Sequence, residues 1–248
     1  MKPAAARYDI SRSIAGFDFF NWLVQEKAAG ATEIVFGGVN QPKDHKWSRA
    51  EVLRRFESIL LPGPALAGLP CRVGDGGVER GSVLTQDLVQ WCRKHGRPPR
   101  LTSVLPPGKA RFTVTLRRTE RSPNRNSDED VWREFAAEIG ATVIEDYAVQ
   151  TVHLHERVAL YAGAEMNLFV TNGPAGLCSL TPYPMMMFDC DIAMGPNGRY
   201  GVPFGTDYLW MMPNQCLVWE AATAETIRRH FYHWLNEGQF LRELKEPT

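Results

Sequence analysis

Cysteine is scarce in this sequence and shows no ordered pattern. The 248 residues include five cysteines, with no Cys-x-x-Cys spacing and no array of histidines beside them. An odd number at scattered positions predicts neither a disulfide framework nor a zinc site. Reduced, mostly buried thiols in a cytoplasmic protein are therefore expected. The five are Cys71, Cys92, Cys178, Cys190 and Cys216.

Long hydrophobic runs are also missing. No segment approaches the roughly 18 consecutive apolar residues of a membrane span. Residues 1–7 lack the long apolar core of a signal peptide. We therefore expect a cytoplasmic protein without a membrane span.

An excess of either charge is absent, as are several catalytic motifs. Lysine plus arginine and aspartate plus glutamate number 28 each, so the formal net charge is zero. Non-specific binding to nucleic acid needs a basic excess, so no nucleic-acid partner is expected. The sequence has no Gly-x-Ser-x-Gly, no Walker-type phosphate loop and no His-Glu-x-x-His. These absences disfavour the common hydrolase, nucleoside triphosphatase and zinc-protease classes.

What the sequence does contain is a regular alternation of strand and helix patterns. This alternation predicts an α/β protein with parallel sheets, and the 44% hydrophobic content suits a buried core. A capping box opens one helix at Ser48 and Pro62 ends it, while the glycine-rich stretch 70–82 is expected to be a loop. Strands are expected at 6–10, 33–37, 110–116, 142–145, 166–170, 185–188 and 215–219, and further helices at 14–28, 85–95, 127–140, 155–164 and 223–236.

A proline-rich stretch near the middle of the chain predicts a domain boundary. Gly96-Arg97-Pro98-Pro99 and Pro106-Pro107-Gly108 break the periodic pattern, which then restarts. We expect one domain over 1–105 and a second over 106–248. The simplest architecture is two Rossmann-like halves that face each other across a cleft.

Arginines gather where the strand at 112–116 ends. Arg117, Arg118, Arg121 and Arg125 follow that strand, interleaved with two asparagines, Asn124 and Asn126. Ligands of open α/β sheets bind at the carboxyl ends of strands, and the arginine fork suits phosphate. The segment therefore predicts an anion site. The alternative is a solvated strand end whose arginines pair with the acidic residues 128–130.

A second candidate site follows the strand at 166–170. The turn Asn172-Gly173-Pro174-Ala175-Gly176 leads into small and apolar residues that are able to begin a short helix. Glycines let a ligand approach the backbone, and exposed amides at a helix start bind phosphate. The alternative is an ordinary turn between two strands.

Three further features are weaker candidates. Asp189-Cys190-Asp191 follows an apolar strand and has the spacing of a divalent-metal site. The alternative is two exposed turn aspartates, since such triplets arise easily by chance. Asp18 and Glu120 are candidates for a base that deprotonates a hydroxyl group. The long loop 195–214 carries Tyr200, Phe204, Tyr208 and Trp210, which either stack on a ligand or pack as a lid.

Together these motifs resemble bacterial glycosyltransferases of the GT-B architecture. The Asn172-Gly173-Pro174 turn is similar to the donor-binding turn of heptosyltransferases, and the strand that ends in Arg117-Arg118 is similar to the arginine segment of fucosyltransferases with related folds. The segment 213–220 resembles the C-terminal piece of such proteins, and 8–19 resembles their opening strand and helix more loosely. The chain is shorter than most members, so the N-terminal half is expected to be reduced.

The resemblance implies a nucleotide-sugar donor held in the interdomain cleft, with no cofactor and no obligatory metal, and a glycan or other hydroxyl acceptor. Arginines would neutralise the diphosphate as the glycosidic bond breaks. Catalytic roles are predicted for Arg117, Arg118 and Asp18. Donor-binding roles are predicted for Arg121, Asn124, Asn126, Asn172, Gly173, Pro174, Ala175 and Gly176.

Three alternatives stay open from the sequence. The first is a non-catalytic module of the same fold that binds nucleotide sugars or glycans. The second is a metal-dependent transferase that uses Asp189 and Asp191. A sugar-nucleotide epimerase is the third.

Overall fold

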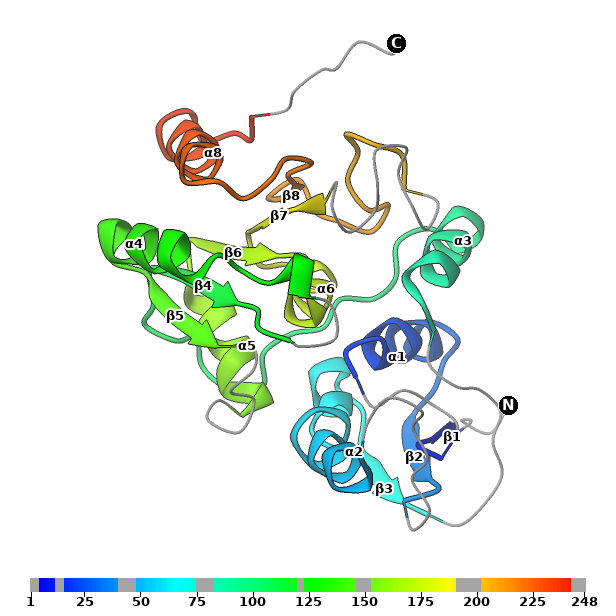
Figure 1. Cartoon of the computed structure of the whole chain (residues 1–248). Coiled ribbons are helices and arrows are strands. Elements are labelled where there is room, and N and C mark those ends of the chain that lie inside the picture. The colour runs from blue at the N-terminus through cyan, green and yellow to red at the C-terminus, as the bar shows by residue number, and fades with distance from the viewer. Residues whose placement is uncertain are drawn as a thin grey trace.

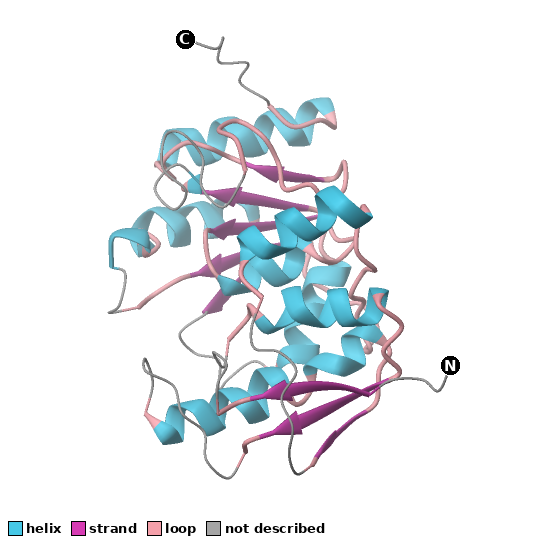
Figure 2. Ribbon diagram, turned by 90° about the vertical axis from the view of Figure 1, so that its right-hand side faces the viewer, coloured by secondary structure: helices cyan, strands magenta, loops and turns pink. Residues whose placement is uncertain are grey.

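The computed structural model describes residues 5–11, 16–39, 48–74, 83–119, 123–145, 153–190 and 202–241. The chain is an α/β protein with two parallel sheets, in the strand orders β1-β2-β3 and β5-β4-β6-β7-β8. Figure 2 shows the sheets at opposite ends of the molecule, with helices between them. Within the described ranges, no helix has both the length and the apolar character needed to cross a bilayer.

The smaller sheet lies in the N-terminal half. Its elements are β1 (Ala5–Asp9), α1 (Phe19–Ala28), β2 (Glu33–Gly37), α2 (Arg49–Arg55), the π-helical turn η1 (Phe56–Leu60), the 3-10 helix η2 (Gly63–Ala67), β3 (Cys71–Val73) and α3 (Thr85–His95). Both pairings are parallel, and Ala5 aligns with Glu33 while Ile34 aligns with Cys71.

The larger sheet lies in the C-terminal half (Figure 1). Its elements are β4 (Phe112–Leu116), the 3-10 turn η3 (Pro123–Arg125), α4 (Glu129–Ile139), β5 (Thr142–Glu145), α5 (Leu154–Gly163), β6 (Met166–Val170), α6 (Gly173–Ser179), β7 (Met185–Phe188), β8 (Gln215–Leu217) and α8 (Ala224–Glu237). Because β4 lies between β5 and β6, the direction of strand addition reverses at the β4–β6 pair. Ligands of doubly wound sheets bind beyond the carboxyl ends of the strands at such a reversal.

The two sheets share one hydrophobic core. A single cluster of buried side chains joins Tyr8 and Phe36 of the smaller sheet to Phe169 on β6 and to Trp210. A second cluster fills the other face of the larger sheet, where α4 and α8 pack, and contains Trp132. The two halves therefore pack against each other through apolar side chains. The predicted boundary between residues 105 and 106 falls between the two sheets and stays a prediction.

Most predicted elements are confirmed, and the differences have local causes. The stretch expected to be a loop from residue 70 contains strand β3, which pairs with β2, while residues 75–82 lie outside the described ranges. The capping box is half formed. The Ser48 hydroxyl accepts from the Glu51 amide at 3.2 Å, whereas the Glu51 carboxylate binds Arg54 and Arg55. The short helix after residue 172 is confirmed as α6.

Candidate functional site

A cleft of about 360 Å³ lies beyond the carboxyl ends of β6 and β7. Both halves of the chain contribute to it, so neither sheet alone forms the site. The N-terminal half supplies the residues that precede α1 and α3, and the C-terminal half supplies η3, the β6–α6 turn, β7 and part of the loop before β8. The lining residues are Phe17, Asp18, Asn21, Leu84, Thr85, Arg125, Thr171, Asn172, Gly173, Gly176, Met187, Tyr208 and Trp210.

Two long helices begin at this cleft. Asp18 precedes α1, and Thr85 is the first residue of α3. The start of a helix carries a partial positive charge, although the Phe19 and Phe20 amides of α1 already donate to the Gly16 and Phe17 carbonyls. Asn21, in the first turn of α1, is held by a hydrogen bond from its Nδ2 to the Val83 carbonyl at 3.0 Å. That bond joins the two helix starts, so their positive ends share one wall of the cleft.

Three polar side chains in the cleft have buried atoms that no other described residue pairs. These atoms are Arg125 Nε, Thr171 Oγ1 and Asn172 Nδ2. Thr171 is only 4% exposed. A buried polar atom without a partner is costly, and in folded proteins such atoms are commonly satisfied by a bound ligand or an ordered water. All three atoms are able to donate a hydrogen bond, so the group that would satisfy them is an acceptor, and an anion suits Arg125 best.

The three residues are held together by their own loops. Arg125 Nη2 donates to the Thr171 carbonyl at 2.9 Å, which ties the segment after β4 to the turn after β6. Asn172 caps α6, since its Oδ1 accepts from the Ala175 amide at 2.8 Å. The Asn172 amide nitrogen is thereby fixed in orientation while its protons stay available. These bonds therefore fix the loops that carry the three donors at the reversal point of the sheet.

Gly173 lies where the two halves touch. A Cβ placed on Gly173 would lie 2.5 Å from Phe17 Cδ2 and 2.9 Å from Phe17 Cβ. The second distance involves the root of the side chain, so rotation of the ring alone does not remove the overlap. Glycine at this position thus allows the residue before Asp18 to approach the β6–α6 turn.

Gly173→Ala is expected to reduce the free energy of unfolding by about 1–2 kcal/mol, because the new methyl group overpacks the contact with Phe17. Urea denaturation measures this loss. The control is Gly176→Ala on the same helix, where an added Cβ meets no described atom within 4 Å. Equal stability of the two variants would contradict the assigned contact.

Arg117 and Arg118 lie in the segment that follows β4. The described lining of the cleft includes Arg125 but neither of these two. Arg117 Nη1 donates to Asn126 Oδ1 at 3.1 Å, and Arg118 is 69% exposed with Glu129 at 3.8 Å. Their predicted catalytic roles stay predictions.

The asparagines predicted to bind the donor lie in the same loop. Asn126 holds the loop after β4, because its side chain accepts from the Thr119 amide at 2.9 Å and donates to the Thr119 carbonyl at 3.0 Å. Asn124 and Asn126 line a separate hollow beside Asp189. Arg121 and Glu120 lie outside the described residues. The donor-binding roles of Asn124, Asn126 and Arg121 therefore remain predictions.

Of the predicted β6–α6 turn, Asn172, Gly173 and Gly176 line the cleft. Pro174 and Ala175 are buried in the first turn of α6 and are not part of the described lining of the cleft. Cys178 on the same helix is fully buried, and burial raises the pKa of its thiol to about 12. A thiol with that pKa is protonated at neutral pH, so Cys178 is a packing residue and not a nucleophile.

Asp18 also lines the cleft, and its neighbour Phe17 packs beside Gly173 of the β6–α6 turn. It precedes α1 without accepting a capping hydrogen bond from that helix. Within the described lining, it is the one carboxylate. This position suits the predicted role as a base, which stays a prediction.

The aromatic residues of the loop before β8 divide between two places. Tyr208 and Trp210 line the cleft and stack on each other, with ring centroids 4.6 Å apart and planes 13° apart. Phe204 packs on Trp219 instead, at 5.0 Å. Tyr200 lies outside the described residues.

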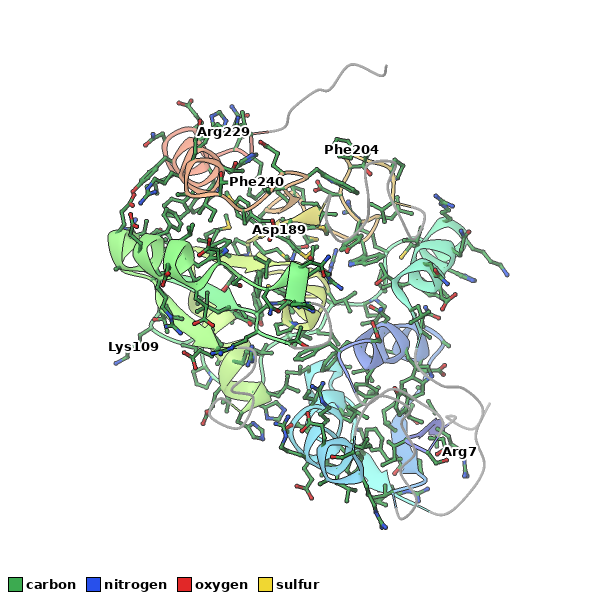
Figure 3. All side chains as sticks on the ribbon, in the orientation of Figure 1. Arg7, Lys109, Asp189, Phe204, Arg229 and Phe240 are labelled. Atoms are coloured by element: carbon green, nitrogen blue, oxygen red, sulfur yellow. The ribbon has the colours of Figure 1, made fainter. Side chains whose placement is uncertain are left out.

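Asp189 lies in the half of the molecule that holds the larger sheet (Figure 3). Its backbone is left-handed, with φ of 58°, and its Oδ1 accepts from the Ala222 amide at 2.7 Å. Asp191 lies outside the described ranges. Among the residues that the structure describes, no three His, Cys, Asp or Glu side chains gather as a metal site would require. The Asp189 carboxylate thus has a structural role in joining β7 to the segment before α8.

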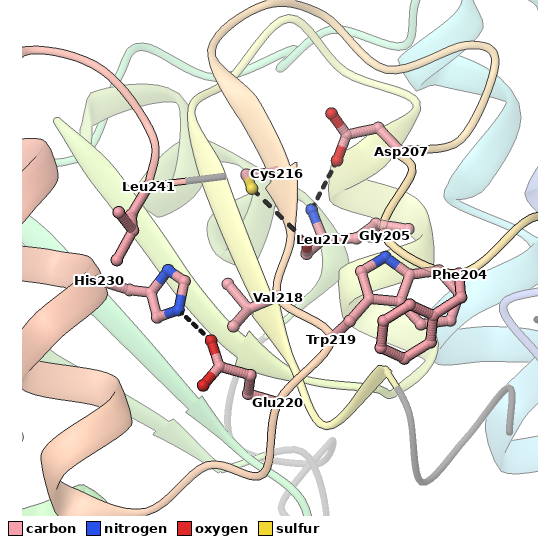
Figure 4. A pocket seen from close by; sticks show the side chains of 10 residues that line it. All are labelled: Phe204, Gly205, Asp207, Cys216, Leu217, Val218, Trp219, Glu220, His230 and Leu241. Atoms are coloured by element: carbon pink, nitrogen blue, oxygen red, sulfur yellow. Dashed lines mark hydrogen bonds and ion pairs between the residues drawn. The ribbon is translucent and has the colours of Figure 1, made fainter. Parts of the chain in front are cut away.

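A second cavity lies between β8 and α8, but it is small (Figure 4). Its volume is about 40 Å³, which is enough for a water molecule but too small for a sugar. His230 Nε2 lies 2.7 Å from Glu220 Oε1 at its edge, and Arg229 pairs with the same carboxylate. Burial acts to raise the pKa of Glu220, but the bonds from His230 and Arg229 outweigh it and lower the pKa. This group therefore anchors α8.

Six lining residues were not predicted as site residues from the sequence: Phe17, Asn21, Leu84, Thr85, Thr171 and Met187. Five of them have no local motif that marks them. Thr171 does carry a local signal, because a polar residue directly after a buried strand at a sheet reversal is a recurrent ligand position.

Comparisons of the chain with protein-family models, with curated proteins and with solved structures found no match. The chemistry of the cleft is therefore the basis for the functional conclusion.

Proposed function

We propose that this protein is a glycosyltransferase of GT-B type, which takes a nucleotide sugar as donor and a hydroxyl group as acceptor without an obligatory metal. One observation carries the proposal. Arg125, Thr171 and Asn172 present buried donors without partners among the described residues, at the reversal point of a parallel sheet. The diphosphate of a donor is an acceptor-rich anion of the kind that such donors bind.

The residues that line the cleft would act on two different parts of the reaction. Arg125 and the starts of α1 and α3 would stabilise negative charge on the leaving diphosphate while the bond from the anomeric carbon to the phosphate oxygen breaks. Asp18 would accept the proton of the acceptor hydroxyl as that oxygen bonds to the anomeric carbon. The assignment to glycosyl transfer rests on the resemblance of the Asn172-Gly173-Pro174 turn and of the Arg117-Arg118 strand end. The two parallel sheets are compatible with a Rossmann-like fold, which the GT-B proposal requires.

The test is a thermal-shift and calorimetric screen of nucleoside diphosphates and their sugar derivatives, with chelator present. A ligand that binds only the folded protein raises the melting temperature, with roughly 2.7 kcal/mol of stabilisation at a hundredfold excess over Kd. We expect a nucleotide sugar to bind and to release its nucleoside diphosphate when acceptors are supplied.

Three outcomes of this screen oppose the proposal. No binding at millimolar concentration rejects the nucleotide-sugar site altogether. Binding without turnover on any acceptor supports the non-catalytic module. Turnover that is lost with chelator and restored by a divalent metal supports the metal-dependent transferase.

A further inference from the structure

Gly176 has no structural reason to be glycine. It lies inside α6, its backbone is not among the left-handed glycines, and an added Cβ would meet no described atom within 4 Å. Glycine is a poor helix former, and alanine would strengthen the same turn. Gly173 differs, since Phe17 fills the space beside it. The open side of Gly176 faces the cleft.

A flat and rigid aromatic surface forms another part of the same cleft. Trp210 is buried at 2% exposure, and Tyr208 stacks on it with planes 13° apart. The pair is linked to Gly176 by hydrogen bonds. Trp210 Nε1 donates to Ser179 Oγ at 3.0 Å, and Ser179 Oγ donates to the Gly176 carbonyl at 2.7 Å.

Arg100 strengthens this connection. Its guanidinium donates to the Ser179 carbonyl at 3.2 Å and to the carbonyl of Trp210. The position of the aromatic pair relative to α6 is therefore set by side chains that are themselves fixed. Because Tyr208 stacks on the buried Trp210, a ligand ring in the cleft would stack on Tyr208, whose position Trp210 fixes. A ring held in this way loses little side-chain entropy on binding.

We propose that the space bounded by Gly176 and the Tyr208–Trp210 pair is a slot for a planar ring, the nucleobase of the ligand. The inference rests on the proposed function, because it takes the anion at Arg125, Thr171 and Asn172 to be the phosphate of that same nucleotide. Stacking on an aromatic face suits every base, so the slot selects for a base without selecting strongly among bases. The absence of a side chain at Gly176 leaves the thickness that the ring needs.

The test compares pairs of ligands that differ only in the base. Uridine and adenosine 5′-monophosphates are titrated into the wild-type protein by calorimetry beside ribose 5-phosphate. Both nucleotides are expected to bind at least roughly tenfold more tightly than ribose 5-phosphate, the factor that one stacked base supplies. In Gly176→Leu this advantage disappears, while the affinity for ribose 5-phosphate stays within about twofold.

Gly176→Ala serves as the variant that keeps the fold. Its melting temperature is expected to equal or exceed that of the wild type, while its preference for the nucleotides falls. Three results overturn the slot alone: equal wild-type affinity for nucleotide and ribose 5-phosphate, unchanged nucleotide binding in Gly176→Leu, or a selective loss of glucose 1-phosphate binding, which would place a pyranose there. If no nucleotide, sugar phosphate or nucleotide sugar binds the wild type, the proposed function fails and the slot fails with it.

Discussion

Arg125→Gln is expected to weaken the binding of a nucleoside diphosphate by roughly tenfold to a hundredfold. The reason is that hydrogen bonds between charged partners contribute about 1.5–3 kcal/mol, and Arg125 is the cation in the described lining of the cleft. Glutamine keeps part of the length and polarity of the side chain but removes the positive charge and the paired N–H donors of the guanidinium group. Calorimetric titration of the diphosphate at constant ionic strength measures the change.

Arg118→Gln is the matched control. Arg118 follows the same strand but is 69% exposed, and its ion pair with Glu129 is long, at 3.8 Å. We expect its diphosphate affinity to stay within about twofold of the wild type, since an exposed ion pair at that distance contributes little. A larger loss of diphosphate affinity in Arg118→Gln than in Arg125→Gln would instead support the arginines directly after β4 as the phosphate ligands. It would also limit Arg125 to holding the Thr171 carbonyl.

Gly163→Ala is expected to have the largest effect on stability, a loss of about 3 kcal/mol in the free energy of unfolding. A Cβ on Gly163, the last residue of α5, would lie 1.9 Å from the carbonyl oxygen of Gly108. Gly108 is itself held to α5, since its amide donates to the Ala159 carbonyl at 2.7 Å. The clash is between backbone and methyl group, so no side-chain rotation relieves it.

Urea denaturation followed by circular dichroism tests this expectation, with Gly176→Ala as the control for replacing a helical glycine. The change in the midpoint, at an unchanged slope, reports the loss of stability. A Gly163→Ala variant within about 0.5 kcal/mol of the wild type would show that the segment before β4 is able to move away from α5 at little cost.

The arginines after β4 show which features of the site depend on local sequence and which depend on tertiary contacts. The concentration of arginines after β4 is visible in the sequence, and the carboxyl end of a strand is the correct place to look for a site. Which arginine reaches the cleft is not visible. The position of Arg125 depends on the turn Pro123–Arg125 and on Asn126, whose side chain fixes the loop through two hydrogen bonds to the backbone of Thr119. Such contacts depend on backbone geometry that no periodicity encodes.

The two glycine positions in α6 make the same distinction. The turn and short helix after β6 follow from Asn172 as cap, Gly173-Pro174 as the first turn and a buried strand before them. The sequence alone, however, does not distinguish the role of Gly173 from that of Gly176. One is required by Phe17, which comes from the other half of the chain, and the other faces an open cleft.

The sequence by itself determined the alternation of strands and helices, the parallel α/β class and the segments that end at the sheet reversal. These features depend on hydrophobic periodicity and on caps and turns within a few residues, and such interactions are local. Only the tertiary structure decided that α1 and α3 begin at the same cleft as Arg125 and Thr171, and that Asp18 lines this cleft together with the β6–α6 turn. Those neighbours are far apart in the chain, and the packing of one shared core brings them together.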